Sequence, residues 1–377
     1  MKVIVNALPL ARPLSGVGQY IYQLYKAMPE VSCKYFYGYA WSNDLSIRQN
    51  GVFAQLDNWS EKSWLVQKCI GISRRAIFTY GSIGSHTHLY HEPNFLPLLI
   101  NGPLVITLHD LSPLRLPQTH TSSKVRIFTE RLPLAIQRAS ALLVVSDFVK
   151  KEVVEYFPEA AGKITTTHLG VRNQFRSLSE ESMAPILRRR NLVADHYLLA
   201  IGTLEPRKNL ISALKAYSLL PDKLRERYPL VIGGMKGWLT DDLDRAMEPM
   251  IQKGQVRLLG FVPDIDMNAL YSGARAFIYP SLYEGFGLPP LEAMASGTPV
   301  ITSNRASLPE VVGDAGIQVE PLDIDQLSQA MLSLLEDDHR HQELRKRGLE
   351  RASRFTWEDT ALKTYEVFRS VVAQGRP

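Results

Sequence analysis

The sequence predicts an α/β protein made of two doubly wound domains. The chain has 377 residues, which is long enough for two hydrophobic cores. Short β-branched runs alternate with helical stretches, as expected for parallel sheets covered on both faces. This alternation restarts after a polar, arginine-containing interval at residues 175–196. We therefore place the first domain at residues 1–180 and the second at 190–356.

Twelve strand-like runs define the two sheets. Those of the first domain are VIVNALPL, KYFYGYA, THLYHEP, PLVITLHD, ALLVVSD and ITTTHLG. Those of the second are YLLAIGT, PLVIGG, VRLLGFV, AFIYPS, PVITS and GIQVEP. After residue 322 the pattern is helical, and residues 357–374 carry an apolar stripe that needs a surface on either domain. Ligands are expected at the carboxyl ends of the strands.

The composition argues against a disulfide-rich, a membrane-spanning and a nucleic-acid-binding protein. The two cysteines, Cys33 and Cys69, indicate neither a disulfide framework nor a metal site, which fits a reducing cytoplasm. No apolar run reaches the roughly 18–20 residues needed to cross a bilayer, so we expect any membrane contact to be peripheral. The net charge of +5 favours an anionic partner. No nucleic-acid-binding signature accompanies this charge.

The first glycine loop, RPLSGVGQYIYQL at residues 12–24, follows the first strand and opens a helix. Gly16 and Gly18 permit close backbone approach, and the helix start offers free N–H groups, so the loop suits a phosphate. A purely structural turn remains the alternative. A nicotinamide fingerprint is less convincing, because Ile21 occupies its third glycine position.

Histidines mark a second candidate region. His109 and Asp110 end the strand PLVITLHD, which places them at the edge where ligands bind, although a structural histidine is the alternative. His86, His88 and His91 are close in sequence, so we considered a metal site. In a strand, however, His91 lies opposite the other two, and we expect no metal there.

The stretch GTLEPRKN contributes a pair of basic residues. Arg207 and Lys208 come just before a helix for which Asn209 is a suitable cap. A guanidinium, an ammonium and a helix start at one strand end form an anion site suited to a diphosphate. A solvated basic loop is the alternative.

Two acids flank a glycine loop in SLYEGFGLPPLEAMASG. Glu284 lies in the loop, whereas Glu292 lies in the short helix that a double proline begins. This pattern favours separate contacts with separate hydroxyl groups over a hydrolytic carboxylate pair. The backbone N–H groups of Phe286, Gly287 and Leu288 suit a phosphate or sugar oxygen.

Together these motifs resemble the retaining nucleotide-sugar glycosyltransferases with the GT-B fold, in the group called family four. The matching residues are LSGVGQY, LHD, VSDFVKKEV, GTLEPRKN and EGFGLPPLEAMASGTPVITSN, in the expected order. The resemblance implies two Rossmann-like domains facing a deep cleft, with the helix at residues 357–374 crossing back to the first domain. One departure is His168-Leu169, where relatives often have Pro-Asn.

The resemblance also implies roles in binding the donor. Arg207 and Lys208 would neutralise the donor diphosphate and stabilise it as a leaving group. Glu292 would hold the ribose hydroxyls. Glu284 and the backbone of residues 286–288 would bind the donor sugar, with a more catalytic part for Glu284 left open.

The first domain would bind the acceptor. His109 would face the transferred sugar, and Gly16 and Gly18 would let the first loop approach the diphosphate and the acceptor. The resemblance implies same-face attack with retention, no metal and no other cofactor.

Substrate choice follows a narrower resemblance, to bacterial polysaccharide and O-antigen mannosyltransferases. It implies GDP-mannose as donor, with UDP-glucose or another activated hexose as the alternative, and a lipid-linked or growing oligosaccharide as acceptor. A basic amphipathic stretch at residues 122–140 suits the inner face of an anionic plasma membrane, or is an internal helix with solvated basic edges. A nicotinamide dehydrogenase and a non-catalytic nucleotide-sugar binding module are the other classes considered.

Overall fold

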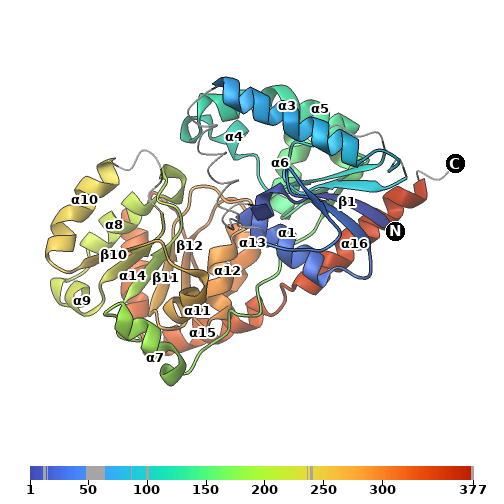
Figure 1. The fold of residues 1–377 in the computed structure, drawn as a ribbon. Coiled ribbons are helices and arrows are strands. Elements are labelled where there is room, and N and C mark those ends of the chain that lie inside the picture. The colour runs from blue at the N-terminus through green and yellow to red at the C-terminus, as the bar shows by residue number, and fades with distance from the viewer. Residues whose placement is uncertain are drawn as a thin grey trace. The chain divides into compact units, whose positions relative to one another are not determined.

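The computed structural model describes residues 1–11, 14, 16–47, 64–85, 87–98, 102–235, 237 and 241–374. The chain forms two compact units, each with its own sheet (Figure 1). The first unit comprises Met1–Gly170 and Trp357–Pro377, and the second comprises Val171–Thr356. No helix in the described part of the chain is long and apolar enough to span a bilayer.

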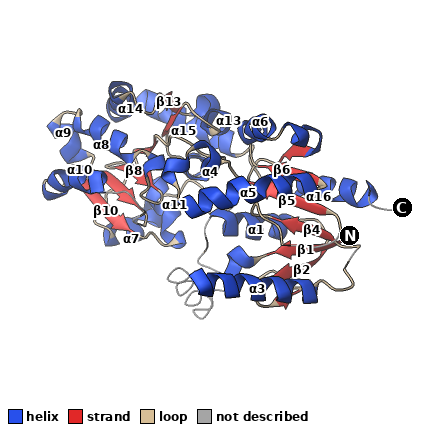
Figure 2. Cartoon of the chain, turned by 90° about the horizontal axis from the view of Figure 1, so that it is seen from above, coloured by secondary structure: helices blue, strands red, loops and turns tan. Residues whose placement is uncertain are grey.

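The first unit contains a seven-stranded sheet in the order β3-β2-β1-β4-β5-β6-β7, most of which Figure 2 shows from above. All pairings are parallel except that of β2 with β3. Its strands are β1 Lys2–Asn6, β2 Ser32–Phe36, β3 Trp41–Ser42, β4 Leu89–Glu92, β5 Leu104–Leu108, β6 Ala141–Val144 and β7 Ile164–Thr166. Its α-helices are α1 Gly16–Ala27, α3 Trp64–Gly81, α4 Ser112–Arg115, α5 Ser122–Arg138, α6 Asp147–Tyr156 and α16 Trp357–Gln374.

Helices cover both faces of this first sheet. Figure 1 shows α3 and α5 on one side of it and α1 and α16 on the other. Helix α16 packs against α1, β4 and β6, and Phe368 is fully buried with its ring 5.2 Å from that of His91. The closing helix therefore belongs to the first unit, as the resemblance implies.

The second unit contains a parallel sheet in the order β10-β9-β8-β11-β12-β13, the arrangement of a Rossmann fold. Its strands are β8 Leu198–Ile201, β9 Leu230–Gly233, β10 Val256–Gly260, β11 Ala276–Tyr279, β12 Val300–Ser303 and β13 Ile317–Val319. Its α-helices are α7 Glu180–Arg189, α8 Leu210–Ser218, α9 Asp222–Arg227, α10 Asp241–Gln252, α11 Asp264–Ser272, α12 Leu288–Ala295, α13 Leu308–Val312, α14 Ile324–Glu336 and α15 Asp338–Ala352.

The structure corrects the boundary between the units. Residues 175–196, expected as a linker, contain α7, which packs against α11. Arg190 pairs with Asp266 at 2.6 Å, and this contact ties the segment to the second unit. The division therefore falls at Gly170, earlier than the predicted boundary at residues 180–190.

Two local expectations also change. The run after Asn6 turns into a 3₁₀ helix, η1 Leu8–Ala11, instead of continuing the first strand. In α5, the apolar side with Phe128, Leu132 and Ile136 is buried in the core of the first unit, so it is not free to enter a membrane.

Candidate active site

The loop after β8 presents the two predicted basic residues. They lie on a 3₁₀ turn, η4 Pro206–Lys208, directly before α8. Asn209 adopts a left-handed conformation at φ 55°, and its side chain donates to the carbonyl oxygens of Pro280 at 3.1 Å and Pro321 at 2.7 Å. Asn209 thus fixes the loop against the neighbouring strand ends and does not cap α8 with its side chain, which corrects that expectation.

Glu284 lies at the centre of this cluster. Its Oε2 pairs with Nη1 of Arg207 at 3.0 Å, and its Oε1 accepts from Nζ of Lys208 at 2.7 Å. The hydroxyls of Tyr279 and Ser281 donate to the same Oε1 at 2.9 and 2.6 Å. The Tyr279 hydroxyl also accepts from Lys208 at 2.6 Å, so one buried network holds the acid and the ammonium.

Arg207 has a second acidic partner. Its Nη2 donates to Oε1 of Glu205 at 2.6 Å, and its Nη1 donates to the carbonyl oxygen of Tyr283 at 2.6 Å. The planar guanidinium is therefore held by contacts on two sides. Two cations and two carboxylates meet within this one cluster.

Burial and charge oppose each other in this cluster. Burial alone would raise the pKa of Glu284, but the charges of Lys208 and Arg207 outweigh it and lower this pKa to about 2. Burial lowers the pKa of Lys208, and Glu284 limits that effect. Glu284 is consequently ionised throughout the neutral range.

The glycine loop between the two acids has a backbone conformation that requires glycine at position 287. Gly287 has φ 118°, and a Cβ there would lie 2.8 Å from Cδ2 of Leu308. The hydroxyl of Ser307 donates to the carbonyl oxygens of Glu284 at 2.8 Å and Phe286 at 2.6 Å. Helix α12 then begins at Leu288, and because Pro289 and Pro290 carry no backbone N–H, the N–H of Leu288 is the one in this first turn that has no acceptor within the helix.

Glu292 belongs to a different ion-pair network. Its Oε1 accepts from Nη2 and Nε of Arg172 at 3.0 and 3.2 Å, and Nη1 of Arg172 donates to Asp264 at 2.7 Å. Burial raises the pKa of Glu292 to about 7 although Arg172 counteracts it. The two acids therefore have different partners and different acidities, in keeping with separate contacts.

His109 lies in the first unit at the end of β5. Its Nε2 is 2.8 Å from the carbonyl oxygen of Pro93, and its ring makes an edge contact with that of Tyr20 at 4.8 Å. Burial lowers the pKa of His109, so the ring is neutral at pH 7. With Nε2 donating to Pro93, Nδ1 is a hydrogen-bond acceptor.

Gly16 and Gly18 both lie in the first turn of α1. Neither has a positive φ, so a left-handed conformation is not the reason for glycine there. A Cβ on Gly18 would lie 3.0 Å from Cδ2 of Leu14 and 3.3 Å from the carbonyl oxygen of Pro9. Gly18 therefore allows close packing against the preceding turn, whereas Gly16 has open space around it.

Of the histidines considered for a metal, His91 has a structural role. His91 is fully buried, with Nδ1 2.7 Å from the Tyr25 hydroxyl and Nε2 2.8 Å from Oγ1 of Thr107. Both of its nitrogens are thus engaged in the core of the first unit. His86 lies outside the described residues.

Sequence reasoning missed five residues of these networks. Glu205 lies inside the EPRKN motif, and Tyr279 and Ser281 end and follow β11, so their positions at strand ends were a usable signal. Arg172 and Asp264 are distant in sequence from Glu292, and no local pattern marks them.

Comparisons with known proteins identify the family of the chain. The family model described as "Glycosyltransferase Family 4" matches residues 14–175, and the model described as "Glycosyl transferases group 1" matches residues 187–351. O-antigen chain mannosyltransferase B of Escherichia coli is 36% identical over 380 residues, covering 98% of this chain and 100% of that protein. The serotype-specific mannosyltransferase WbdA of Escherichia coli is 32% identical over 278 residues, covering 72% of this chain and 34% of the relative.

Solved structures show the same fold at low sequence identity. HepE of Anabaena, solved with UDP and glucose, has a TM-score of 0.72 at 16% identity, covering 98% of this chain and 100% of that one. Sucrose-phosphate synthase of Thermosynechococcus elongatus has a TM-score of 0.71 at 20% identity, covering 99% of both chains. The fold is GT-B. With two family models and a full-length relative in agreement, the chain belongs to the glycosyltransferases that carry a family 4 and a group 1 domain.

Proposed function

We propose that this glycosyltransferase moves mannose from GDP-mannose onto a lipid-linked or growing oligosaccharide of the O-antigen type. The observation that carries the transfer chemistry is the Arg207 and Lys208 pair held around Glu284 at a strand end. Two cations on a rigid loop suit a diphosphate leaving group. The choice of mannose rests on the full-length likeness to an O-antigen chain mannosyltransferase.

Each acid has its own task in this proposal. Arg207 and Lys208 bind the diphosphate and stabilise its charge as the sugar departs. Glu284 and the backbone of residues 286–288 bind the hydroxyls of the donor sugar, and Glu292 binds the ribose hydroxyls. Carboxylate oxygens accept hydrogen bonds from hydroxyl groups, and the charge of Arg172 favours the ionised form of Glu292, so both acids are suitable.

The first unit supplies the acceptor side. His109 contacts the transferred sugar through Nδ1, and the turn containing Gly16 and Gly18 contacts substrate through its backbone. In the reaction, the bond from the anomeric carbon to the diphosphate oxygen breaks, and an acceptor oxygen bonds to that carbon on the same face. The proton of the acceptor hydroxyl passes to the departing phosphate oxygen. Configuration is thereby retained.

We further propose that the enzyme works at the inner face of the plasma membrane and contacts it through α3. Ile72, Tyr80 and Ile83 are 59, 80 and 70% exposed along and just beyond this helix. Lys68 and Arg75 are exposed beside them, and residues 64–83 include no Asp or Glu. An apolar stripe with basic neighbours suits an anionic bilayer.

The test is transfer by the purified protein with a panel of nucleotide sugars. Release of GDP or UDP is measured with and without a lipid-linked acceptor, and the product is tested for anomeric configuration. We expect release of GDP from GDP-mannose and an α-linked product. Preference for UDP-glucose would replace the donor, and donor binding without transfer to any acceptor would make the protein a nucleotide-sugar binding module.

A further inference from the structure

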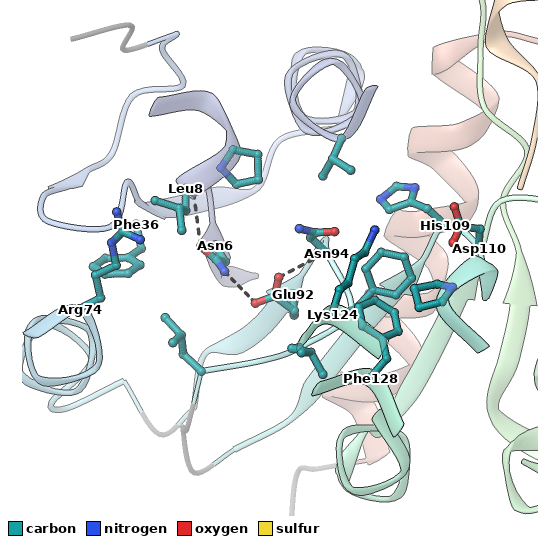
Figure 3. A pocket seen from close by; sticks show the side chains of 16 residues that line it. Asn6, Leu8, Phe36, Arg74, Glu92, Asn94, His109, Asp110, Lys124 and Phe128 are labelled. Carbon is teal, nitrogen blue, oxygen red and sulfur yellow. Dashed lines mark hydrogen bonds between the residues drawn. The ribbon is translucent and has the colours of Figure 1, made fainter. Parts of the chain in front are cut away.

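A pocket of about 820 Å³ lies entirely within the first unit (Figure 3). Its volume is within the range of about 300–1,000 Å³ that is usual for small-molecule sites. Its apolar walls include the rings of Phe36, Phe95 and Phe128. Its polar residues include Glu92 and Asn94, at and just beyond the end of β4, and Asn6, at the end of β1. This is the edge of the sheet where ligands bind.

Glu92 is the most constrained polar residue of the pocket. It is 1% exposed, and its Oε2 accepts from Nδ2 of Asn6 at 2.8 Å and from the Tyr90 hydroxyl at 2.7 Å. Its Oε1 accepts from the backbone N–H of Asn94 at 3.0 Å. A carboxylate offers about four acceptor sites, so these three bonds leave one on Oε1. The network therefore fixes the orientation of the carboxylate and leaves it able to accept one more hydrogen bond.

We propose that this pocket binds the terminal sugar of the acceptor and that Glu92 selects that sugar by accepting a hydrogen bond from one of its hydroxyls. The proposal rests on the transferase function proposed above, because it names where the acceptor of that reaction binds. Asn94, which is exposed at the same edge, is placed to contact a neighbouring hydroxyl.

The lining favours a neutral saccharide over an anionic ligand. Aromatic rings pack well against the C–H face of a sugar ring, while a few fixed polar groups set its orientation. A phosphate fits Glu92 poorly, because the ionised carboxylate and a phosphate carry like charges that repel. Arg74 and Lys124, on α3 and α5, also line the pocket and offer N–H donors to further hydroxyls.

The acidity of Glu92 gives the proposal a second readout. Burial raises the pKa of this carboxyl to about 7, while its hydrogen bonds with Asn6, Tyr90 and Asn94 oppose the shift. The other charged or titratable residues that line the pocket are Arg74, His109, Asp110 and Lys124. As the pH falls through about 7, Glu92 becomes protonated and accepts hydrogen bonds less well, so the acceptor should bind more weakly at pH 6 than at pH 8.

The experiment compares Glu92→Gln with the wild type in the full-length protein. Binding of a mannose disaccharide is measured by ligand-observed NMR without donor, and the acceptor KM is measured by transfer at pH 6 and pH 8. We expect Glu92→Gln to weaken disaccharide binding and raise the acceptor KM at least tenfold. The donor KM and acceptor-independent release of nucleotide should be unchanged, and the pH dependence of acceptor KM should diminish.

Two further variants keep the test decisive. Asn94→Ala changes an exposed side chain, so it should fold normally and still raise the acceptor KM. Glu152→Gln removes another buried acid of the same unit, one paired with Arg115 at 2.8 Å, and should leave acceptor binding unchanged. An unchanged acceptor KM in folded Glu92→Gln would overturn the assignment while the wild type still transfers. Absence of transfer by the wild type with every donor would instead contradict the proposed function.

Discussion

The charge of Arg207 and Lys208 is balanced by Glu205 and Glu284 in the structure. A diphosphate that binds this pair therefore competes with Glu284 for the same N–H donors. Glu284 also accepts from the hydroxyls of Tyr279 and Ser281, and those two bonds do not depend on the cations. The acid would thus keep two partners while the cations bind a substrate, so their neutralisation in the structure is compatible with the proposed leaving-group role.

Lys208→Ala should reduce kcat by about 10²- to 10³-fold, the usual cost of removing one preorganised donor to a developing charge. Arg207→Ala should have a similar effect. Initial rates of transfer with saturating substrates measure this, and circular dichroism checks the fold. Lys215→Ala, on the exposed side of α8, is the control and should retain wild-type rates. A near-normal kcat in both Lys208→Ala and Arg207→Ala would contradict the proposal that these residues bind the donor diphosphate.

Arg172→Met should raise the donor KM, because the charge of Arg172 counteracts the effect of burial on Glu292. Without that charge the pKa of Glu292 rises above about 7, and the neutral carboxyl accepts from ribose less well. The increase should be larger at pH 7 than at pH 9, and Arg172→Lys should restore part of the affinity. Arg245→Met, whose side chain is 78% exposed in the same unit, should have no effect. A pH-independent increase would contradict the link through Glu292.

Local sequence patterns identified several residues that now carry the proposed site. A basic pair at a strand end, or an acid beside a glycine loop, is visible because motif and element boundary coincide. Arg172 and Glu92 were not predicted. Arg172 and Glu292 are 120 positions apart in the sequence. Glu92 is identified as a candidate only by the pocket that it lines in the folded unit. Such partners depend on tertiary structure, which a linear pattern does not encode.

Within the described residues, helix α3 carries two large apolar side chains, Ile72 and Tyr80, that are each more than half exposed. Ile72→Ser combined with Tyr80→Ser should weaken binding to vesicles containing phosphatidylglycerol at least tenfold, because membrane affinity scales with the apolar area inserted. Co-sedimentation with anionic and with neutral vesicles measures it. Leu134→Ser, on α5 and 61% exposed, is the control. Equal binding of the α3 variant and the wild type would refute α3 as the contact.

Helix α16 completes the core of the first unit. Phe368→Ala should destabilise that unit by about 3–5 kcal/mol, the usual cost of truncating a buried phenylalanine. Hydrogen exchange should show lost protection in β4 and β6 while the second unit keeps its protection. Leu362→Ala, half exposed on the same helix, should change stability little. A uniform loss of protection across both units would show that α16 stabilises more than the first unit.

Periodicity predicted elements better than it predicted their ends. Each of the twelve strand-like runs overlaps a strand, because buried parallel strands have short β-branched sequences. The two-residue strand β3 was missed, since an edge this short leaves little pattern. The α7 segment was predicted to be a linker because its composition is polar. In the structure, Arg189 and Arg190 form ion pairs with Asp266 on α11 and hold the segment in place.

For the whole molecule, we expect transfer that does not depend on a divalent cation. In the proposed function, Arg207 and Lys208 would supply the positive charge that a metal ion supplies in other phosphate sites. Activity of metal-stripped protein in EDTA should equal that in magnesium. If EDTA abolished activity and magnesium restored it, the two side chains would not suffice and the metal-independent mechanism would be wrong.

The return of α16 to the first unit also affects how the molecule is made. A chain emerging from the ribosome presents α1 and the first sheet long before residues 357–374 exist. Until then, the surface that α16 covers, including the ring of His91, lacks its partner. The first unit to be synthesised is therefore the last to be finished. A nascent chain stalled before residue 357 should have a compact second unit and a first unit that remains open to proteases and chaperones.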